Sequence, residues 1–263
     1  MGMQTVNGVT LSYTDQGNRQ ALVLLHAFPV DSRMWAAQIS DLAPRCRVIA
    51  PDFRGFGQSP PAGPFTIPSL VDDVHALLTA LGALPCVLAG TSMGGYVALN
   101  FARKYPTDLR GLVLVDTKAE ADNPEQRENR NKMIEVARTM GAKAVADAMS
   151  GKMLSPETFD HRPETVQALR AMMEACPVET IVHALTALRD RPDMSDALPS
   201  VCVPTLILVG EEDAITPLAV AQSMQRQIPR AELKIVRGAG HMSPMEQPEQ
   251  VNQALANFVA GLA

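Results

Sequence analysis

Residues 88–99, LAGTSMGGYVAL, carry a Gly-x-Ser-x-Gly pattern between an apolar run and an amphipathic helical pattern. This arrangement is typical of a strand, a tight turn and a helix in succession. Glycines at positions 90 and 94 remove side chains that would collide where the strand and the helix converge. The turn would expose the hydroxyl of Ser92 near the N-terminus of the helix, where unpaired N–H groups favour negative charge. The segment therefore predicts a positioned nucleophile, and the alternative is a glycine-rich turn with an incidental serine.

Short apolar runs bounded by turn residues recur on both sides of this segment. From the second run onward they are nearly continuous rather than alternating, which suits parallel strands buried on both faces. Helical patterns separate most of them: Pro106 ends one over 93–105, while Ser69 with Asp72 begins another that Gly82 ends. This alternation predicts a doubly wound, mostly parallel α/β sheet. The expected strands cover residues 5–13, 21–26, 47–52, 86–92, 111–116, 205–210 and 232–238.

The alternation stops over residues 118–199, which show helix-like segments and no convincing strand. Prolines stand where the first turns of helices would lie. We therefore expect a helical cap over 118–199, inserted into the α/β core made of residues 1–117 and 200–263. The expected cap helices cover residues 124–140, 142–149, 163–175 and 177–188.

Composition narrows the functional classes. The chain has 263 residues, 46% of them hydrophobic, which is enough for one large domain with a substantial core. A net charge of −5, without long Lys/Arg blocks, argues against nucleic acid and anionic membranes as partners. The N-terminus lacks the pattern of a signal peptide, and no apolar run approaches the roughly 20 residues of a membrane span. We expect a cytoplasmic protein that acts on a small molecule, and the sequence carries no signal for its oligomeric state.

Cysteine and histidine spacing gives no sign of a metal site. The four cysteines lie far apart without a C-x-x-C pair, so neither a zinc site nor a disulfide framework is indicated. The five histidines form no H-x-x-x-H or H-E-x-x-H pair. We therefore expect neither a metal nor another cofactor.

Candidate partners of Ser92 lie farther along the chain. A serine hydroxyl is a weak nucleophile unless a histidine accepts its proton and a carboxylate orients that histidine. Asp213 in GEEDAITP and His241 in GAGHMSPMEQP each follow an expected strand. Their order along the chain is serine, acid, histidine, which is the order expected after a Gly-x-Ser-x-Gly turn. Asp116 also follows an expected strand and is the alternative acid.

These motifs together resemble those of the α/β-hydrolase fold family, in particular small esterases, lactonases and perhydrolases. The resemblance spans nearly the whole chain, and it implies Ser92, His241 and Asp213 as catalytic residues. The segments that carry it are HAFP (26–29), DFRGFGQS (52–59), GTSMGG (90–95), GEEDAITP (210–217) and GAGH (238–241).

The resemblance also implies an oxyanion hole formed by the backbone N–H groups of Phe28 and Met93. His26 would order the loop around Phe28 through hydrogen bonds. The family usually has glycine where this sequence has Ala27, and alanine costs about 1 kcal/mol if the position needs a positive φ. Trp35 and Ala27 flank the loop and are the candidates for the substrate pocket.

The function implied is a serine hydrolase of the carboxylesterase type, which cleaves small to medium, largely uncharged esters through an acyl-enzyme. The same triad would serve an enol-lactone hydrolase, a carbon–carbon bond hydrolase, or a cofactor-free perhydrolase or haloperoxidase. Dehalogenases and epoxide hydrolases of the family carry an aspartate at the position of Ser92, which argues against both. A non-enzymatic ligand-binding protein on the same fold is a further alternative, and the sequence leaves these open.

Overall fold

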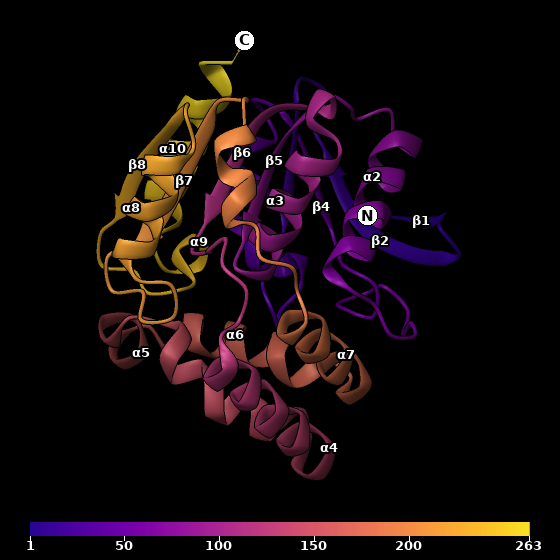
Figure 1. Ribbon diagram of the computed structural model, residues 1–263, viewed down its shortest axis with the longest axis vertical. Helices are drawn as coiled ribbons and strands as arrows, with labels where there is room; N and C mark the ends of the chain where they lie inside the picture. Colours follow the sequence, from indigo (N-terminus) through magenta and orange to yellow (C-terminus); the bar gives the residue numbers. More distant parts are fainter. Residues whose placement is uncertain (263) are drawn as a thin grey trace.

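The computed structural model describes residues 1–262 and contains a sheet of eight strands (Figure 1). The strands are β1 (Gly2–Val6), β2 (Val9–Gln16), β3 (Ala21–Leu25), β4 (Arg47–Pro51), β5 (Cys86–Thr91), β6 (Leu109–Val115), β7 (Thr205–Gly210) and β8 (Ala231–Val236). Their order across the sheet is β1-β2-β4-β3-β5-β6-β7-β8. The β1–β2 and β2–β4 pairings are antiparallel, and the other pairings are parallel. This is the mostly parallel, doubly wound α/β fold that the apolar runs predicted.

Helices cover both faces of the sheet. They are α1 (Ala36–Leu42), α2 (Ile67–Ala80), α3 (Met93–Lys104), α8 (Leu218–Gln227) and α10 (Pro248–Ala260). Val23 and Leu25 of β3 belong to the core beneath α2, α3 and α8, whereas Leu22 and Leu24 belong to the core beneath α1 and α10. Because successive side chains of a strand point to opposite faces, a strand buried on both faces must be apolar throughout.

The first expected strand, residues 5–13, is in fact a β-hairpin. Asn7 and Gly8 have φ values of 48° and 77°, and they connect β1 to β2. Val6 pairs directly with Val9 across this two-residue turn. An Asn-Gly pair adopts such a turn readily because both positions require positive φ. The prediction of one strand was therefore wrong, although the turn signal was present in the sequence.

Helix α2 begins earlier than predicted. Its N-cap is Thr66, whose hydroxyl accepts a hydrogen bond from the N–H of Ser69, while the Ser69 hydroxyl accepts one from the N–H of Thr66. Pro68 lies in the first turn, where its missing N–H has no cost. Ser69 is therefore the third residue of the helix rather than its start, and the capping box joins Thr66 to Ser69.

The chain between β6 and β7 forms helices and no strand among the described residues. These helices are α4 (Pro124–Met153), α5 (Pro156–His161), α6 (Pro163–Ala175) and α7 (Val178–Arg189). In Figure 1 they lie together beyond the end of the sheet at which the chain leaves β6. Gly141, with φ 81° and ψ 179°, interrupts α4 at the break expected between 124–140 and 142–149. The division into a core (1–117 and 200–263) and a cap (118–199) stays a prediction.

Two further findings concern the chain as a whole. No helix within residues 1–262 is long and apolar enough to cross a membrane. The cysteines are free, and Cys202 is exposed while the other three are buried.

Candidate active site

Ser92 occupies a strained turn between β5 and α3. Its backbone has φ 51° and ψ −110°, a conformation that a residue with a side chain rarely adopts. The turn is held on both sides by hydrogen bonds. The Ser92 N–H donates to the carbonyl of Val115 at 3.0 Å, and the Ser92 carbonyl accepts from the N–H groups of Gly95 and Tyr96 and from the hydroxyl of Thr117. This geometry presents the serine hydroxyl at the end of the sheet, as the Gly-x-Ser-x-Gly pattern predicted.

The flanking glycines allow α3 to cross the strands at very short range. A Cβ at Gly90 would collide with the backbone of Gly94 and Gly95 on α3. A Cβ at Gly94 would collide with the backbone carbonyl of Leu25 at the end of β3. Small residues are required here because the obstacles are backbone atoms, which cannot rotate away.

We expect Gly90→Ala to lower the free energy of unfolding by roughly 2–4 kcal/mol, because the new methyl group forces α3 away from β5. Gly63→Ala is the matched control, since a Cβ there meets no atom within 4 Å. Its expected effect is within about 0.5 kcal/mol. Urea unfolding followed by circular dichroism measures both, and equal midpoints for the two variants would contradict the close-packing explanation.

The structure brings the three predicted side chains, which we call the triad, into one hydrogen-bonded line. His241 Nε2 lies 2.9 Å from Ser92 Oγ, and His241 Nδ1 lies 2.9 Å from Asp213 Oδ2. An ionised carboxylate only accepts hydrogen bonds, so the imidazole proton resides on Nδ1. Nε2 is then left to accept the hydrogen bond of the serine hydroxyl.

Asp213 is held in place by more than the histidine. Its Oδ1 accepts hydrogen bonds from the N–H groups of Ile215 and Thr216 at 2.8 and 2.9 Å, and its Oδ2 accepts one from the Thr216 hydroxyl at 2.6 Å. Burial alone would raise the pKa of Asp213, but His241 and these donors lower it below its usual value. Thr216 was not identified from the sequence, although it stands three residues after Asp213.

His241 is buried, and its environment favours the protonated imidazole. Burial alone would lower its pKa, but Asp213, followed by Asp116 and Glu246, raises the pKa of His241 above its usual value. A raised pKa makes the ring a stronger proton acceptor when it is neutral. The histidine is therefore suited to accepting a proton from Ser92.

Asp116, the alternative acid, has different partners. Its Oδ1 accepts a hydrogen bond from the N–H of Gly210 at 2.8 Å, and its Oδ2 accepts bonds from the N–H and hydroxyl of Ser243 at 3.1 and 2.6 Å. Within residues 1–262 it makes no hydrogen bond to His241. Burial and the neighbouring Asp213 raise the pKa of Asp116 to about 8. Asp116 thus joins the ends of β6 and β7 to the loop of His241, while Asp213 contacts the imidazole.

A second buried carboxylate, Glu246, also holds the histidine loop. Glu246 lies on α9 (Ser243–Glu246), and its Oε1 accepts hydrogen bonds from the N–H groups of Gly240 and Met242 at 2.9 and 3.2 Å. Its Oε2 accepts a bond from the N–H of Ser155 at 2.7 Å, which ties this loop to the helical segment. The sequence analysis missed this role, although Glu246 lies in the same GAGHMSPMEQP motif as the histidine.

The loop that follows β3 carries Phe28, one of the two expected oxyanion donors, and is held by hydrogen bonds of His26. His26 Nδ1 donates to the carbonyl of Ala27 at 2.8 Å, and His26 Nε2 accepts from the N–H of Phe53 at 3.0 Å, so His26 orders the loop as predicted. Ala27 does not have a positive φ, so alanine replaces the usual glycine without strain. Met93 is the first residue of α3, where N–H groups lack an acceptor within the helix.

A cavity of about 290 Å³ is lined by neighbours of the triad, although Ser92, Asp213 and His241 are not themselves in its lining. Thr216, which contacts both Asp213 and His241, forms part of its wall, and so does Tyr96, one helical turn after Ser92. Its apolar wall comes mainly from the helical segment and the loop after β7, through Met133, Met149, Leu185 and Ile215.

Trp35 and Ala27 do not line this cavity. Both side chains are fully buried in the core beneath α1 and α10. Proximity in sequence to the loop around Phe28 suggested a place in the pocket, but Ala27 follows β3 and Trp35 ends a short 3₁₀ helix (Ser32–Trp35), and both side chains pack into this core. The prediction that Trp35 and Ala27 line the pocket is therefore corrected.

No group of three or more histidine, cysteine, aspartate or glutamate side chains within residues 1–262 is arranged to hold a metal ion. The site described above is built from a hydroxyl, an imidazole, carboxylates and backbone N–H groups.

The fold and this geometry agree with the comparisons with known proteins. Residues 22–254 match the model of the alpha/beta hydrolase family, so the chain belongs to this family. The AB hydrolase superfamily protein YisY of Bacillus subtilis is 33% identical, and the match covers 97% of each chain. 3-oxoadipate enol-lactonase 2 of Acinetobacter baylyi is 28% identical, over 95% of this chain and 93% of that protein.

Among solved structures, a thermophilic esterase from Thermogutta terrifontis superposes with a TM-score of 0.95. It is 40% identical, and the match covers 99% of this chain and 97% of that chain. The enol-lactonase of Burkholderia xenovorans superposes with a TM-score of 0.92 at 27% identity, over 98% of this chain and 100% of that chain. The chain is thus an alpha/beta hydrolase whose relatives include esterases and enol-lactonases.

Proposed function

We propose that the protein is a serine hydrolase that cleaves small to medium carboxylic esters, with Ser92 as nucleophile, His241 as general base and Asp213 as the acid that orients the base. The observation that carries this proposal is the line of two 2.9 Å hydrogen bonds from Ser92 through His241 to Asp213. Similarity to the Thermogutta terrifontis esterase supports the same reaction class.

In the acylation step, Ser92 Oγ attacks the ester carbonyl carbon while its proton passes to His241 Nε2. The negative charge on the carbonyl oxygen is stabilised by the N–H groups of Phe28 and Met93. Each donor of this kind contributes roughly 10²- to 10³-fold to such a step. The protonated imidazole then gives its proton to the departing alkoxide, and the acyl group remains bound to Ser92.

In the deacylation step, His241 takes a proton from water, and the resulting hydroxide attacks the acyl carbon. The proton then returns from the imidazole to Ser92 Oγ as the carbon–oxygen bond breaks, and the free acid leaves. In both steps the Asp213 carboxylate accepts a hydrogen bond from the Nδ1–H group, and this bond stabilises the imidazolium.

We assign residues 118–199 the role of a cap that supplies part of the substrate pocket. Met133 and Met149 on α4 and Leu185 on α7 supply apolar cavity wall from this segment. Flexible and apolar side chains of this kind suit acyl groups of several shapes. The hydrogen bond from Ser155 to Glu246 connects the segment to the loop of His241.

Enol-lactone hydrolysis is the second candidate, because two of the similar proteins are enol-lactonases. It would use the same triad on a cyclic ester. A panel of alkyl esters, aryl esters and lactones, with peracid detection in the presence of hydrogen peroxide, distinguishes these activities from a perhydrolase. Sustained turnover of esters or lactones supports the proposal. Absence of turnover on the whole panel would favour a ligand-binding role and contradict it.

The activity should depend on pH through His241, which must be neutral to accept the serine proton. Its raised pKa places the midpoint of the acid limb of kcat/KM above the usual histidine value of 6.5. The rate is then expected to rise with pH through that midpoint. A pH profile of kcat/KM measures it, and a midpoint well below 6 would contradict the environment described for His241.

A further inference from the structure

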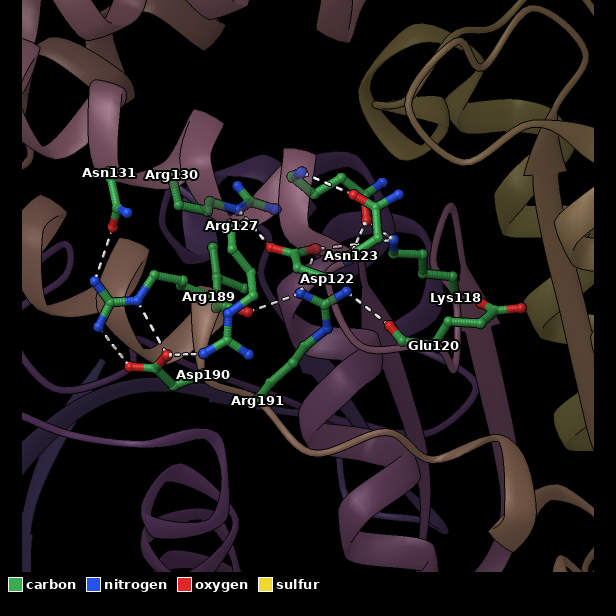
Figure 2. Close-up of polar contacts among 12 residues, drawn as sticks. Lys118, Glu120, Asp122, Asn123, Arg127, Arg130, Asn131, Arg189, Asp190 and Arg191 are labelled. Carbon is green, nitrogen blue, oxygen red and sulfur yellow. Dashed lines mark hydrogen bonds and ion pairs between the residues drawn. The ribbon is translucent and has the colours of Figure 1, made fainter.

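A group of charged side chains forms part of the cavity wall. Lys118, Arg130 and Lys152 are the cations of this wall, and Asp122 is its carboxylate. Figure 2 shows Lys118, Arg130 and Arg191 around Asp122. Arg191 is not among the residues that line the cavity. The cavity thus carries an excess of positive charge although the whole chain has a net charge of −5.

Asp122 is already shared by the two arginines. Arg191 lies 2.8 Å from Asp122 Oδ1, and Arg130 donates to Asp122 Oδ2 at 3.1 Å. The Arg191 guanidinium also stacks over the ring of Tyr96, 4.3 Å from its centroid. This buried carboxylate is therefore satisfied without Lys118.

Lys118 has few partners of its own. Within residues 1–262, its ammonium makes one hydrogen bond, to Gln126 Oε1 at 3.2 Å, and its nearest carboxylate oxygen in an ion pair is Asp122 Oδ1 at 3.8 Å. The side chain is 13% exposed, so it has lost most of its contact with solvent. Burial and then the neighbouring Arg191 lower its pKa, although Asp122 and Glu120 act in the opposite sense. An ammonium group has three N–H donors, and this one has few partners and little water around it. Binding an additional anion would therefore stabilise it.

The position of Lys118 connects it to the reacting serine. It follows Thr117, whose hydroxyl donates to the carbonyl of Ser92 at 2.8 Å. Tyr96 and Thr216, which lie beside the triad, line the same cavity as Lys118 and Arg130. A ligand in this cavity would therefore contact the cations at one part of the wall and Tyr96 and Thr216, the neighbours of the triad, at another.

We propose that Lys118, assisted by Arg130, binds a carboxylate on the acyl part of the substrate, so that the preferred substrates are esters or lactones of dicarboxylic acids. This inference rests on the proposed function, because it assigns the substrate class of the same site. It departs from the expectation of a largely uncharged substrate. That expectation was based only on the apolar and methionine-rich composition of the helical segment.

The test compares three methyl esters with the same chain. Monomethyl adipate carries a terminal carboxylate, methyl 6-amino-6-oxohexanoate carries a neutral amide of the same shape, and methyl hexanoate carries a methyl group. Wild type should show a kcat/KM for the carboxylate at least about tenfold above that for the amide, the size expected for one charge-assisted hydrogen bond. Released methanol measures the rate for all three.

Lys118→Met should reduce this carboxylate-to-amide ratio about tenfold, chiefly through KM for the carboxylate. Lys132→Met is the matched control, since Lys132 is an exposed cation on the same helix as Arg130 and does not line the cavity. Its ratio should stay within about twofold of wild type. For wild type alone, raising the salt concentration from about 0.05 M to about 0.5 M should lower the carboxylate-to-amide ratio. Salt ions screen the attraction between Lys118 and the substrate carboxylate.

The outcomes separate the two proposals. Ser92-dependent hydrolysis with no preference for the carboxylate would overturn the inference and leave ester hydrolysis intact. A preference that survives both Lys118→Met and high salt would also overturn it. Failure of wild type on all three esters and on the wider panel would instead count against the proposed function itself.

Discussion

Ser92→Ala is expected to lower kcat/KM for ester hydrolysis by at least about 10³-fold. Without the hydroxyl no acyl-enzyme forms, and His241 has no serine proton to accept. The residual rate would come from the backbone donors and from binding alone. Ser92 has φ 51°, and alanine at this position keeps the same backbone strain, so the fold should be retained. The measurement is kcat/KM on the best ester of the panel, with circular dichroism of both proteins.

Ser40→Ala is the matched control, because Ser40 is an exposed serine on α1, distant in sequence from every residue of the triad. We expect it to keep wild-type activity. Near-native turnover by Ser92→Ala in a preparation free of contaminating esterases would refute the role of Ser92.

The second large effect distinguishes the two carboxylates near the histidine. Asp213→Asn is expected to lower kcat/KM by roughly 10³- to 10⁴-fold, as in triads where the orienting carboxylate becomes an amide. An amide NH₂ in that place donates to His241 Nδ1 and leaves the proton on Nε2. The imidazole would then be unable to accept the hydrogen bond of Ser92.

Asp116→Asn should lower kcat/KM by less than about tenfold, because Asp116 contacts Gly210 and Ser243 rather than the imidazole. Steady-state kinetics of the two variants, with equal unfolding midpoints as a check, decide the assignment. If Asp116→Asn lost more activity than Asp213→Asn, Asp116 would be the acid.

Much of the fold could be predicted from local patterns in the sequence. The continuous apolar run of residues 21–26 indicated a strand buried on both faces, and β3 is such a strand. Pro106 indicated the end of a helix, and α3 ends at Lys104. Such signals are reliable because burial and the missing proline N–H act within a few residues of the chain.

Other features were missed or misplaced because two signals competed. The run over 5–13 reads as one strand unless the Asn-Gly pair is given more weight than the apolar residues around it. Ser69 resembles an N-cap, but Thr66 takes that position because Pro68 is well suited to the first turn. In the pocket, proximity along the chain suggested Trp35, whereas the short 3₁₀ helix Ser32–Trp35 packs its side chain in the core.

The sequence by itself determined the parallel sheet and the strained serine turn, because both depend on residues that are neighbours in the chain. Only the tertiary structure decided which carboxylate reaches His241, since Asp116 and Asp213 both follow strands and differ only in where their loops converge. It also decided the charge of the cavity wall. Lys118 and Arg130 come from different elements, and the excess of cations exists only because folding places them around a single buried carboxylate, Asp122.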